Sequence, residues 1–129
     1  MRLYLDTAIV IYDVERVVPF ASRVQTRLSA ANLEMVVSDL TRLECRVKPL
    51  REANHALVRA YDLYFDSVCA EVAPLTRQTL ERAAALRAAY GFRTPDAIHL
   101  AVSIESNCGA FLTNDQQLVR CQEIPVEML

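Results

Sequence analysis

Short apolar runs alternate along this chain with stretches in which apolar residues recur every three or four positions. A short apolar run bounded by polar residues predicts a buried strand, whereas the wider spacing predicts a helix with one buried face. The runs predict strands over residues 2–5, 33–37, 67–72, 109–113 and 124–128. The spacing predicts helices over residues 7–15, 19–31, 40–48, 52–66, 77–90 and 94–105.

Helix start and stop signals support these boundaries. Thr76 is a good N-terminal cap, and Gly91 is a good C-terminal stop for the helix that follows it. Pro49 is expected to end the helix before it, and Thr94 followed by Pro95 is expected to open the last helix. That last helix is apolar nearly all round, so we expect it to be buried on more than one side.

Strands that alternate with helices predict an α/β fold. The expected architecture has three layers, in which a central parallel sheet of four to five strands carries helices on both faces. The chain has 129 residues, of which 53% are hydrophobic and 23% charged, and this composition is typical of a globular protein. We therefore expect a single domain over residues 1–129.

The sequence also gives indications about the cellular location of the protein, the state of its cysteines and its partners. No apolar run approaches the roughly 20 residues that a membrane span needs, and the start of the chain lacks the pattern of an export signal. These observations favour the cytoplasm. The cysteines Cys45, Cys69, Cys108 and Cys121 form no Cys-x-x-Cys pair, which favours reduced thiols over a disulfide framework or a zinc site. The net charge of −2 counts against a generic nucleic-acid binder, which is usually basic.

Four acidic residues occupy unusual positions. Asp6 and Asp115 follow apolar strands, and the carboxyl ends of parallel strands meet at one edge of a sheet, where ligands bind. Glu44 lies among apolar positions of its predicted helix, and Asp96 lies in the first turn of the buried helix. A charged group in an apolar setting is costly unless it is paired or bound to a metal. The four together predict an acidic pocket for a divalent cation.

Simpler roles exist for each of these acids. Asp6, Asp96 and Asp115 could each be a helix cap or a first-turn acid, which is the better reading of each one taken singly. Glu44 could be a surface residue paired with Arg42, Arg46 or Lys48. The spacing by itself leaves these readings and the metal pocket about equally supported.

Four segments of the chain resemble, in order, the motif blocks of PIN-domain ribonucleases, and most of all those of VapC-type toxins of bacterial toxin–antitoxin pairs. The resemblance covers nearly the whole chain, and Ala8 departs from it, since many members have Ser or Asn there. The segments are Leu3-Tyr4-Leu5-Asp6-Thr7, Ser38-Asp39-Leu40-Thr41-Arg42-Leu43-Glu44, Thr94-Pro95-Asp96-Ala97-Ile98-His99-Leu100-Ala101 and Leu112-Thr113-Asn114-Asp115.

The resemblance implies a metal-dependent endoribonuclease that hydrolyses RNA phosphodiester bonds with Mg²⁺ or Mn²⁺. Asp6, Glu44, Asp96 and Asp115 would be the catalytic, metal-binding acids. Thr113 and Asn114 would orient Asp115, and Thr7 would help to place a metal-bound water or a phosphate. The resemblance also implies a VapB-type antitoxin whose tail occupies the groove at the active site and blocks that site, a homodimer, and a higher assembly with the antitoxin.

Other polar residues near these motifs have two readings each. Arg42, Arg46 and Arg93 could bind substrate phosphate or could balance the acidic residues, and the sequence does not favour either role. His99 lies three positions after Asp96, and we expect it to be a buried or interface residue, because cations such as Mg²⁺ prefer oxygen ligands.

Three other classes of protein compete with this interpretation. A haloacid-dehalogenase-like phosphatase needs a second Asp two positions after the first, where this chain has Ala8, and a response-regulator receiver needs paired acids after its first strand. The serious alternative is a catalytically silent PIN domain that only binds a partner. The presence of all four acids favours the enzyme over that binding module.

Overall fold

The computed structural model describes residues 1–129 and shows a five-stranded, fully parallel sheet in the order β3-β2-β1-β4-β5. The elements follow one another as β1 (Arg2–Leu5), α1 (Thr7–Val14), α2 (Phe20–Leu28), β2 (Glu34–Ser38), α3 (Asp39–Arg51), α4 (His55–Ser67), β3 (Glu71–Ala73), α5 (Arg77–Tyr90), α6 (Thr94–Glu105), β4 (Ala110–Thr113), the 3₁₀ helix η1 (Gln116–Arg120) and β5 (Val126–Met128).

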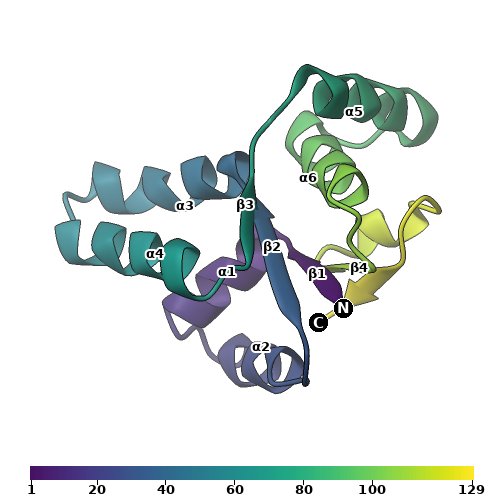
Figure 1. Cartoon of the computed structure of the whole chain (residues 1–129). Coiled ribbons are helices and arrows are strands. Elements are labelled where there is room, and N and C mark those ends of the chain that lie inside the picture. Colours follow the sequence, from purple (N-terminus) through teal and green to yellow (C-terminus); the bar gives the residue numbers. More distant parts are fainter.

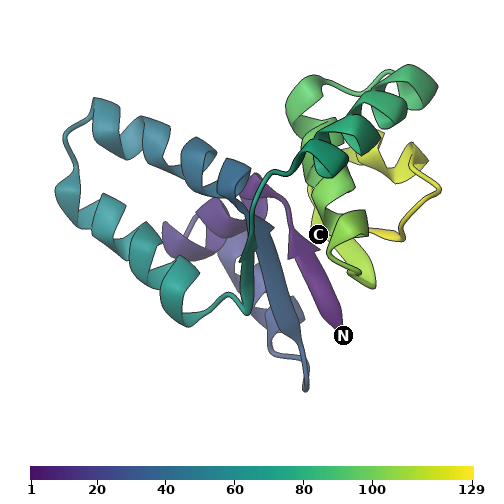
Figure 2. The same cartoon turned by 45° about the horizontal axis from the view of Figure 1, so that its top comes forward.

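Helices cover both faces of the sheet, which confirms the predicted three-layer α/β fold. Figure 1 shows α1 to α4 on one side of the strands and α5 and α6 on the other. Turned by 45°, the same view shows α3 and α4 as a hairpin that extends away from the sheet (Figure 2). No helix is both long enough and apolar enough to span a membrane.

The central strands divide the core between the two faces. On β1, Leu3 and Leu5 join the cluster beneath α1 and α2, whereas Tyr4 between them joins the cluster beneath α5 and α6. On β4, Phe111 packs beside α6 while its neighbour Leu112 faces the other cluster. Successive side chains of a strand point to opposite faces, so continuous apolar runs are what a sheet buried on both sides requires.

The register of the sheet brings distant polar residues to one edge. Leu5 pairs with Leu112, and the next backbone amide, that of Asp6, donates to the Leu112 carbonyl at 3.0 Å. Tyr4 pairs with Val36 on the other side, so β2 ends with Ser38 close to the end of β1. The residues that follow β1, β2 and β4 therefore meet at the same edge of the sheet, as the sequence predicted for β1 and β4.

Several predicted boundaries are wrong, and α2, for example, ends at Leu28 and not at residue 31. Pro49 does not end α3, which continues to Arg51, because a buried proline in the last turn removes only one hydrogen bond and the Glu52 amide still donates to the Lys48 carbonyl at 3.0 Å. Thr94 opens α6 as predicted, but the N-cap residue is Arg93, which makes no side-chain hydrogen bond. The third strand begins at Glu71, because α4 extends to Ser67.

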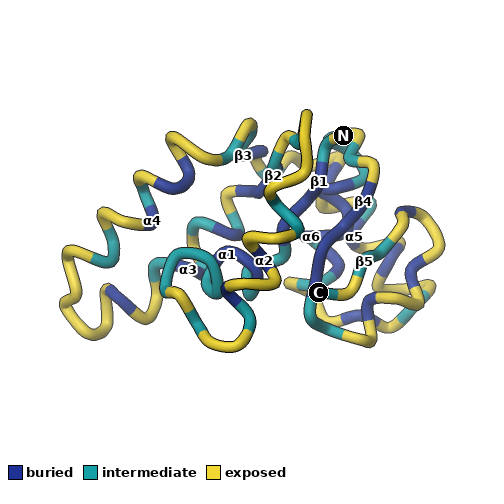
Figure 3. Tube along the Cα trace, turned by 90° about the horizontal axis from the view of Figure 1, so that it is seen from below, coloured by how far each residue is buried: buried dark blue, intermediate teal, exposed yellow.

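The predicted apolar face of α3 is only partly buried. Leu43 and Val47 are 59% and 49% exposed, although their spacing predicted burial. Figure 3 shows the exposed stretches along the α3–α4 hairpin. Only one side of this hairpin faces the rest of the chain, which is why a helical apolar pattern here does not correspond to core. The four cysteines are free, as expected.

Candidate active site

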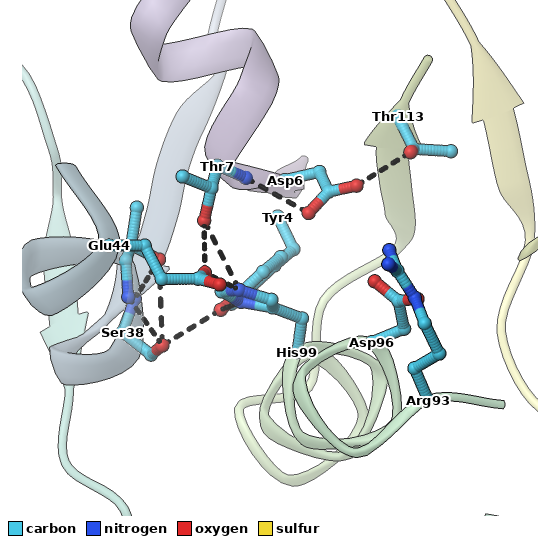
Figure 4. A network of polar contacts seen from close by, with 10 residues as sticks. Tyr4, Asp6, Thr7, Ser38, Glu44, Arg93, Asp96, His99 and Thr113 are labelled. Carbon is cyan, nitrogen blue, oxygen red and sulfur yellow. Dashed lines mark hydrogen bonds and ion pairs between the residues drawn. The ribbon is translucent and has the colours of Figure 1, made fainter. Parts of the chain in front are cut away.

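A cavity of about 270 Å³ lies at the edge of the sheet where β1, β2 and β4 end. Its lining includes all four acids singled out in the sequence, and these come from four separate segments of the chain. Figure 4 shows most of them from close by. The lining residues are Asp6, Thr7, Ala8, Tyr12, Glu44, Arg93, Asp96, His99, Asn114 and Asp115.

Asp6 lies at the junction between β1 and α1. It is the N-cap of α1, and its Oδ1 accepts from the Thr7 backbone amide at 2.9 Å. Its Oδ2 accepts from the hydroxyl of Thr113, a fully buried residue at the end of β4, at 2.7 Å. Burial raises the pKa of Asp6, and the nearby His99 and the Thr113 hydroxyl only partly oppose this effect. Both oxygens of this carboxylate are therefore held by neighbouring segments.

Glu44 is held by α6 and α1. Its Oε1 accepts from His99 Nε2 at 2.6 Å and from the Thr7 hydroxyl at 2.7 Å. Burial raises the pKa of Glu44, but the hydrogen bonds from His99 and Thr7 outweigh it, so the pKa lies below its ordinary value. Glu44 is thus ionised at neutral pH.

Asp96 lies in the first turn of α6, and Arg93 is its partner. Arg93 Nε donates to Asp96 Oδ2 at 3.2 Å, as seen on the right of Figure 4. The Asp96 side chain is 15% exposed, whereas that of Arg93 is 81% exposed. A guanidinium group therefore occupies the solvent side of the cavity next to this carboxylate.

The segment after β4 completes the lining. Asp115 caps η1 by accepting from the Gln117 amide at 3.0 Å, and its own amide donates to the Thr113 hydroxyl at 3.0 Å. The Asn114 side chain makes no hydrogen bond to Asp115, and its Nδ2 donates instead to Tyr12 Oη at 3.1 Å. Thr113 contacts the Asp115 backbone, but its hydroxyl proton goes to the Asp6 carboxylate.

The simpler roles of these acids are only partly realised. Asp6 and Asp115 do cap helices, and yet both line the cavity, so capping and site formation are compatible. The surface-pair reading of Glu44 is wrong, because its partner is His99.

The arginines differ in where the structure places them. Arg42 and Arg46 both pair with Asp62 on α4 and do not line the cavity. Of the three arginines considered for phosphate binding, only Arg93 lines it.

The donor set of the cavity is that of a site for a hard divalent cation. Mg²⁺ and Mn²⁺ prefer carboxylate oxygen, and four carboxylates converge on one cavity. Their side chains are, however, turned to protein partners, and no three acidic, histidine or cysteine residues are close enough to one another to form a metal site. The residue types therefore fit a cation. The carboxylates of Asp6, Glu44, Asp96 and Asp115 are, however, oriented by hydrogen bonds to protein groups and not toward a common centre.

Sequence reasoning missed the hydrogen-bonded residues behind the cavity. His99 is 2% exposed, as expected for a buried residue, but it also contacts Glu44, Thr7 and Tyr4. These partners lie between 55 and 95 positions away along the chain. The one local signal was the occurrence of a histidine on an otherwise apolar helix.

The fold and this acidic cavity define an α/β protein with a polar site at the carboxyl edge of a parallel sheet. The sequence model of the PIN domain family matches residues 3–124, and the chain belongs to that family. The resemblance noted in the motifs is thereby confirmed at the level of the family. A comparison with curated protein sequences finds no match.

Several solved structures share this fold. The VapBC2 complex of Rickettsia felis, bound to a DNA fragment from its promoter, matches with a TM-score of 0.79 and 14% identity over 99% of this chain and 98% of that chain. VapC20 of Mycobacterium tuberculosis, described as a toxin that cleaves the sarcin–ricin loop, matches with a TM-score of 0.76 and 14% identity over 95% and 98%. FitAcB of Neisseria gonorrhoeae matches with a TM-score of 0.71 and 15% identity over 96% and 95%. At these identities the likeness concerns the fold.

Proposed function

We propose that this chain is a single-domain, metal-dependent endoribonuclease that acts as the toxin of a toxin–antitoxin pair. The observation that carries the proposal is the convergence of Asp6, Glu44, Asp96 and Asp115 on one cavity at the carboxyl edge of the sheet. Membership of the PIN domain family and the fold shared with VapC-type toxins support it.

The four carboxylates are the residues that would hold Mg²⁺ or Mn²⁺. Oxygen ligands suit these ions, and a cation offsets the repulsion among acids that face one cavity. When bound, such an ion acidifies water and stabilises the charge that develops on the phosphate oxygens during hydrolysis. The acidic net charge of the chain does not conflict with an RNA substrate, because bound cations determine the local field.

The protein's own side chains perform the positioning. Thr113 and the Thr7 amide hold the two oxygens of Asp6, and His99 and the Thr7 hydroxyl hold Glu44. Arg93, exposed at the mouth of the cavity, is placed to exchange Asp96 for an RNA phosphate. Guanidinium groups form charge-assisted hydrogen bonds with phosphate, so this exchange is chemically reasonable.

The test is cleavage of total cellular RNA by the purified, partner-free chain with Mg²⁺ or Mn²⁺, compared with Asp96→Asn. We expect discrete fragments that require the metal. In Asp96→Asn the rate should fall by at least the roughly tenfold to hundredfold that follows the loss of outer hydrogen bonds at metal sites. The control is Asp66→Asn, since Asp66 is exposed on α4 and its side chain makes no hydrogen bond. Cleavage that persists in Asp96→Asn would contradict the proposed site.

The alternative of a silent binding module predicts a different result. A module that only binds a partner gives no metal-dependent fragments, and Asp96→Asn leaves its binding intact. Folded protein that binds Mn²⁺ without cutting any RNA would favour this alternative.

A VapB-type antitoxin is the proposed partner. The solved structures that share the fold include VapBC and FitAcB complexes. An apolar groove of about 460 Å³ beside α1 and α4, lined in part by Leu63, Tyr64 and Val68, offers a surface for such a chain. We expect coexpression of the antitoxin to relieve growth arrest caused by this protein. Growth arrest that persists despite a tight complex would contradict this role.

A further inference from the structure

A chain of buried hydrogen bonds leads from the core of the sheet to Glu44. Tyr4, fully buried on β1, contacts Ser38 Oγ at 3.0 Å and His99 Nδ1 at 2.7 Å. His99 on α6 then reaches Glu44 Oε1 with its other ring nitrogen. Figure 4 shows these side chains in one continuous row. The row connects β1, the end of β2, α6 and α3.

The end of this row opposite to Glu44 is fixed independently of the cavity. Ser38 is the N-cap of α3 and forms a capping box with Thr41, so the same residue that contacts Tyr4 also fixes the start of the helix that carries Glu44. Tyr4 stacks on Phe111 of β4 with ring centroids 5.2 Å apart. A buried side chain with stacked and hydrogen-bonded neighbours has little freedom to reorient. His99 is therefore held from the side opposite to Glu44.

The contact with Glu44 requires a proton on one particular ring nitrogen. An ionised carboxylate only accepts hydrogen bonds, so His99 Nε2 is the donor in this contact. The Tyr4 hydroxyl has one proton, so it either donates to Ser38 Oγ and accepts from a protonated Nδ1, or donates to an unprotonated Nδ1 while the Ser38 hydroxyl donates to it. In both arrangements Nδ1 has a partner. A histidine ring is oriented by the hydrogen bond at its second nitrogen, as is usual for ligand supports at metal sites.

Both contacts to Glu44 fall on the same oxygen. His99 and Thr7 contact Oε1, and Oε2 has no hydrogen-bond partner in the protein. Since Glu44 lines the cavity, Oε2 is the oxygen left for a cation or a water molecule there. The arrangement thus selects one oxygen of the carboxylate and fixes the side chain that presents it.

We infer that His99, oriented by Tyr4, is a positioning residue that holds Glu44 so that its second oxygen serves the metal site. The inference rests on the proposed function, because Glu44 is positioned to bind the divalent cation of that site. It assigns to His99 no direct contact with the cation or with RNA. The residue acts only through Glu44.

The experiment compares variants that remove or keep the donor. His99→Leu removes it, whereas His99→Gln places an amide NH₂ where it can still reach Glu44. Tyr4→Phe keeps the stacking on Phe111 and removes only the hydroxyl. The matched control for this variant is Tyr61→Phe, since Tyr61 is also fully buried and its hydroxyl contacts the Glu15 carboxylate outside the cavity.

The first measurement is the binding of Mn²⁺ to each folded protein by calorimetry. The dissociation constant should rise about tenfold in His99→Leu, the low end for losing an outer hydrogen bond at a metal site. It should return to within about threefold of wild type in His99→Gln, because the donor is restored. Tyr4→Phe should weaken binding and Tyr61→Phe should not.

The second measurement is independent of metal. The chain has only two histidines, and His55 is exposed, so the imidazole nitrogens of His99 are readily assigned by NMR. We expect an Nε2 proton on His99 that exchanges slowly with water in the wild type, and that exchanges faster in Glu44→Ala and in Tyr4→Phe. A ring with no proton at Nε2 would overturn the inference.

The outcomes separate this inference from the proposed function. Equal Mn²⁺ affinity in wild type and His99→Leu would overturn the positioning role and leave the nuclease proposal standing. A wild-type protein that shows the protected Nε2 proton but binds no Mn²⁺ would remove the metal site, and with it the role of His99 toward a metal. A His99→Gln variant as weak as His99→Leu would show that ring packing, not the donated hydrogen bond, is what matters.

Discussion

Two carboxylates on opposite sides of the cavity are held in different ways. Glu44 is 30% exposed and has a partner, His99, that is 2% exposed, whereas Asp96 is 15% exposed and has a partner, Arg93, that is 81% exposed. The more exposed acid thus has the more buried partner. The rigidity of each acid follows from the surroundings of its partner and not from its own burial.

This difference indicates that the Glu44–His99 pair and the Asp96–Arg93 pair have different roles in the site. A hydrogen bond between a buried donor and a charged group is costly to break, because the groups left behind lose part of the compensation for their burial. An exposed ion pair contributes only about 0–1 kcal/mol, because water replaces either partner. The Glu44 side is therefore organised in advance, and the Arg93 side is the one that rearranges when a cation or a phosphate enters.

The largest effect in this comparison is expected from Thr7→Val, which removes the second donor to Glu44 Oε1 while keeping the shape of the side chain. Mn²⁺ affinity and RNA cleavage should both fall about tenfold, since the carboxylate loses one of the two bonds that fix it. Calorimetry and initial cleavage rates measure the effect. Thr79→Val is the control, because Thr79 is buried and its hydroxyl contacts Thr76 away from the cavity. Equal losses in the two variants would point to general destabilisation.

The next effect has the opposite sign for the metal. Arg93→Ala releases Asp96 from its ion pair, so Mn²⁺ should bind up to about fivefold more tightly, which corresponds to an exposed ion pair worth at most about 1 kcal/mol. The KM for RNA should rise at the same time, because the phosphate loses a donor. The two readouts together distinguish Arg93 as a phosphate contact from Arg93 as a mere counter-charge.

The control for Arg93→Ala is Arg46→Ala. Arg46 pairs with Asp62 and does not line the cavity, so neither Mn²⁺ binding nor the KM should change. A rise of the KM in Arg46→Ala would restore the substrate role that its sequence position left open.

The sequence predicted the residues whose placement follows from strand ends. Asp6 and Asp115 were identified because parallel strands bring their carboxyl ends to one edge, and Asp96 because it lies in the first turn of the buried helix, where the helix dipole favours a negative charge. No local pattern could predict His99 as the partner of Glu44, since that contact depends on how α6 lies against α3. The choice of partner for Arg42 and Arg46 likewise depended on Asp62, which lies on the neighbouring helix of the hairpin.

The apolar pattern of α3 marks another limit of sequence reasoning. The spacing of Leu43 and Val47 is that of a buried face, and α3 is indeed a helix, but both residues are exposed. Periodicity reports which residues share a side of a helix. It does not report whether the rest of the chain reaches that side, which depends on the length of the hairpin relative to the sheet.

The smallest effect is expected from a second arginine–carboxylate ion pair, away from the cavity. Its contribution to stability shows how strong a partly exposed pair such as Arg93–Asp96 is in this protein. Arg27 on α2 donates to both oxygens of Glu127 on β5, at 2.8 and 3.0 Å, and both side chains are partly exposed. The Arg27 hydrogen bonds lower the pKa of Glu127 in the folded protein. The ion pair therefore stabilises the fold fully above the ordinary pKa of a glutamate, about 4.3, and this stabilisation is lost as the pH falls through the lowered pKa. We expect Glu127→Gln to lower the free energy of unfolding by less than about 1 kcal/mol at pH 7.

Denaturant unfolding of wild type and Glu127→Gln over a pH series measures this pair directly. The difference between the two proteins should be constant near neutral pH and should shrink as the solution is acidified, while RNA cleavage at pH 7 is unchanged. If the bidentate Arg27–Glu127 pair contributed several kcal/mol, partly exposed arginine–carboxylate pairs in this protein would be strong. The single-point pair of Arg93 with Asp96 could then no longer be regarded as the side of the cavity that opens easily, and the contrast with the His99 side would be lost.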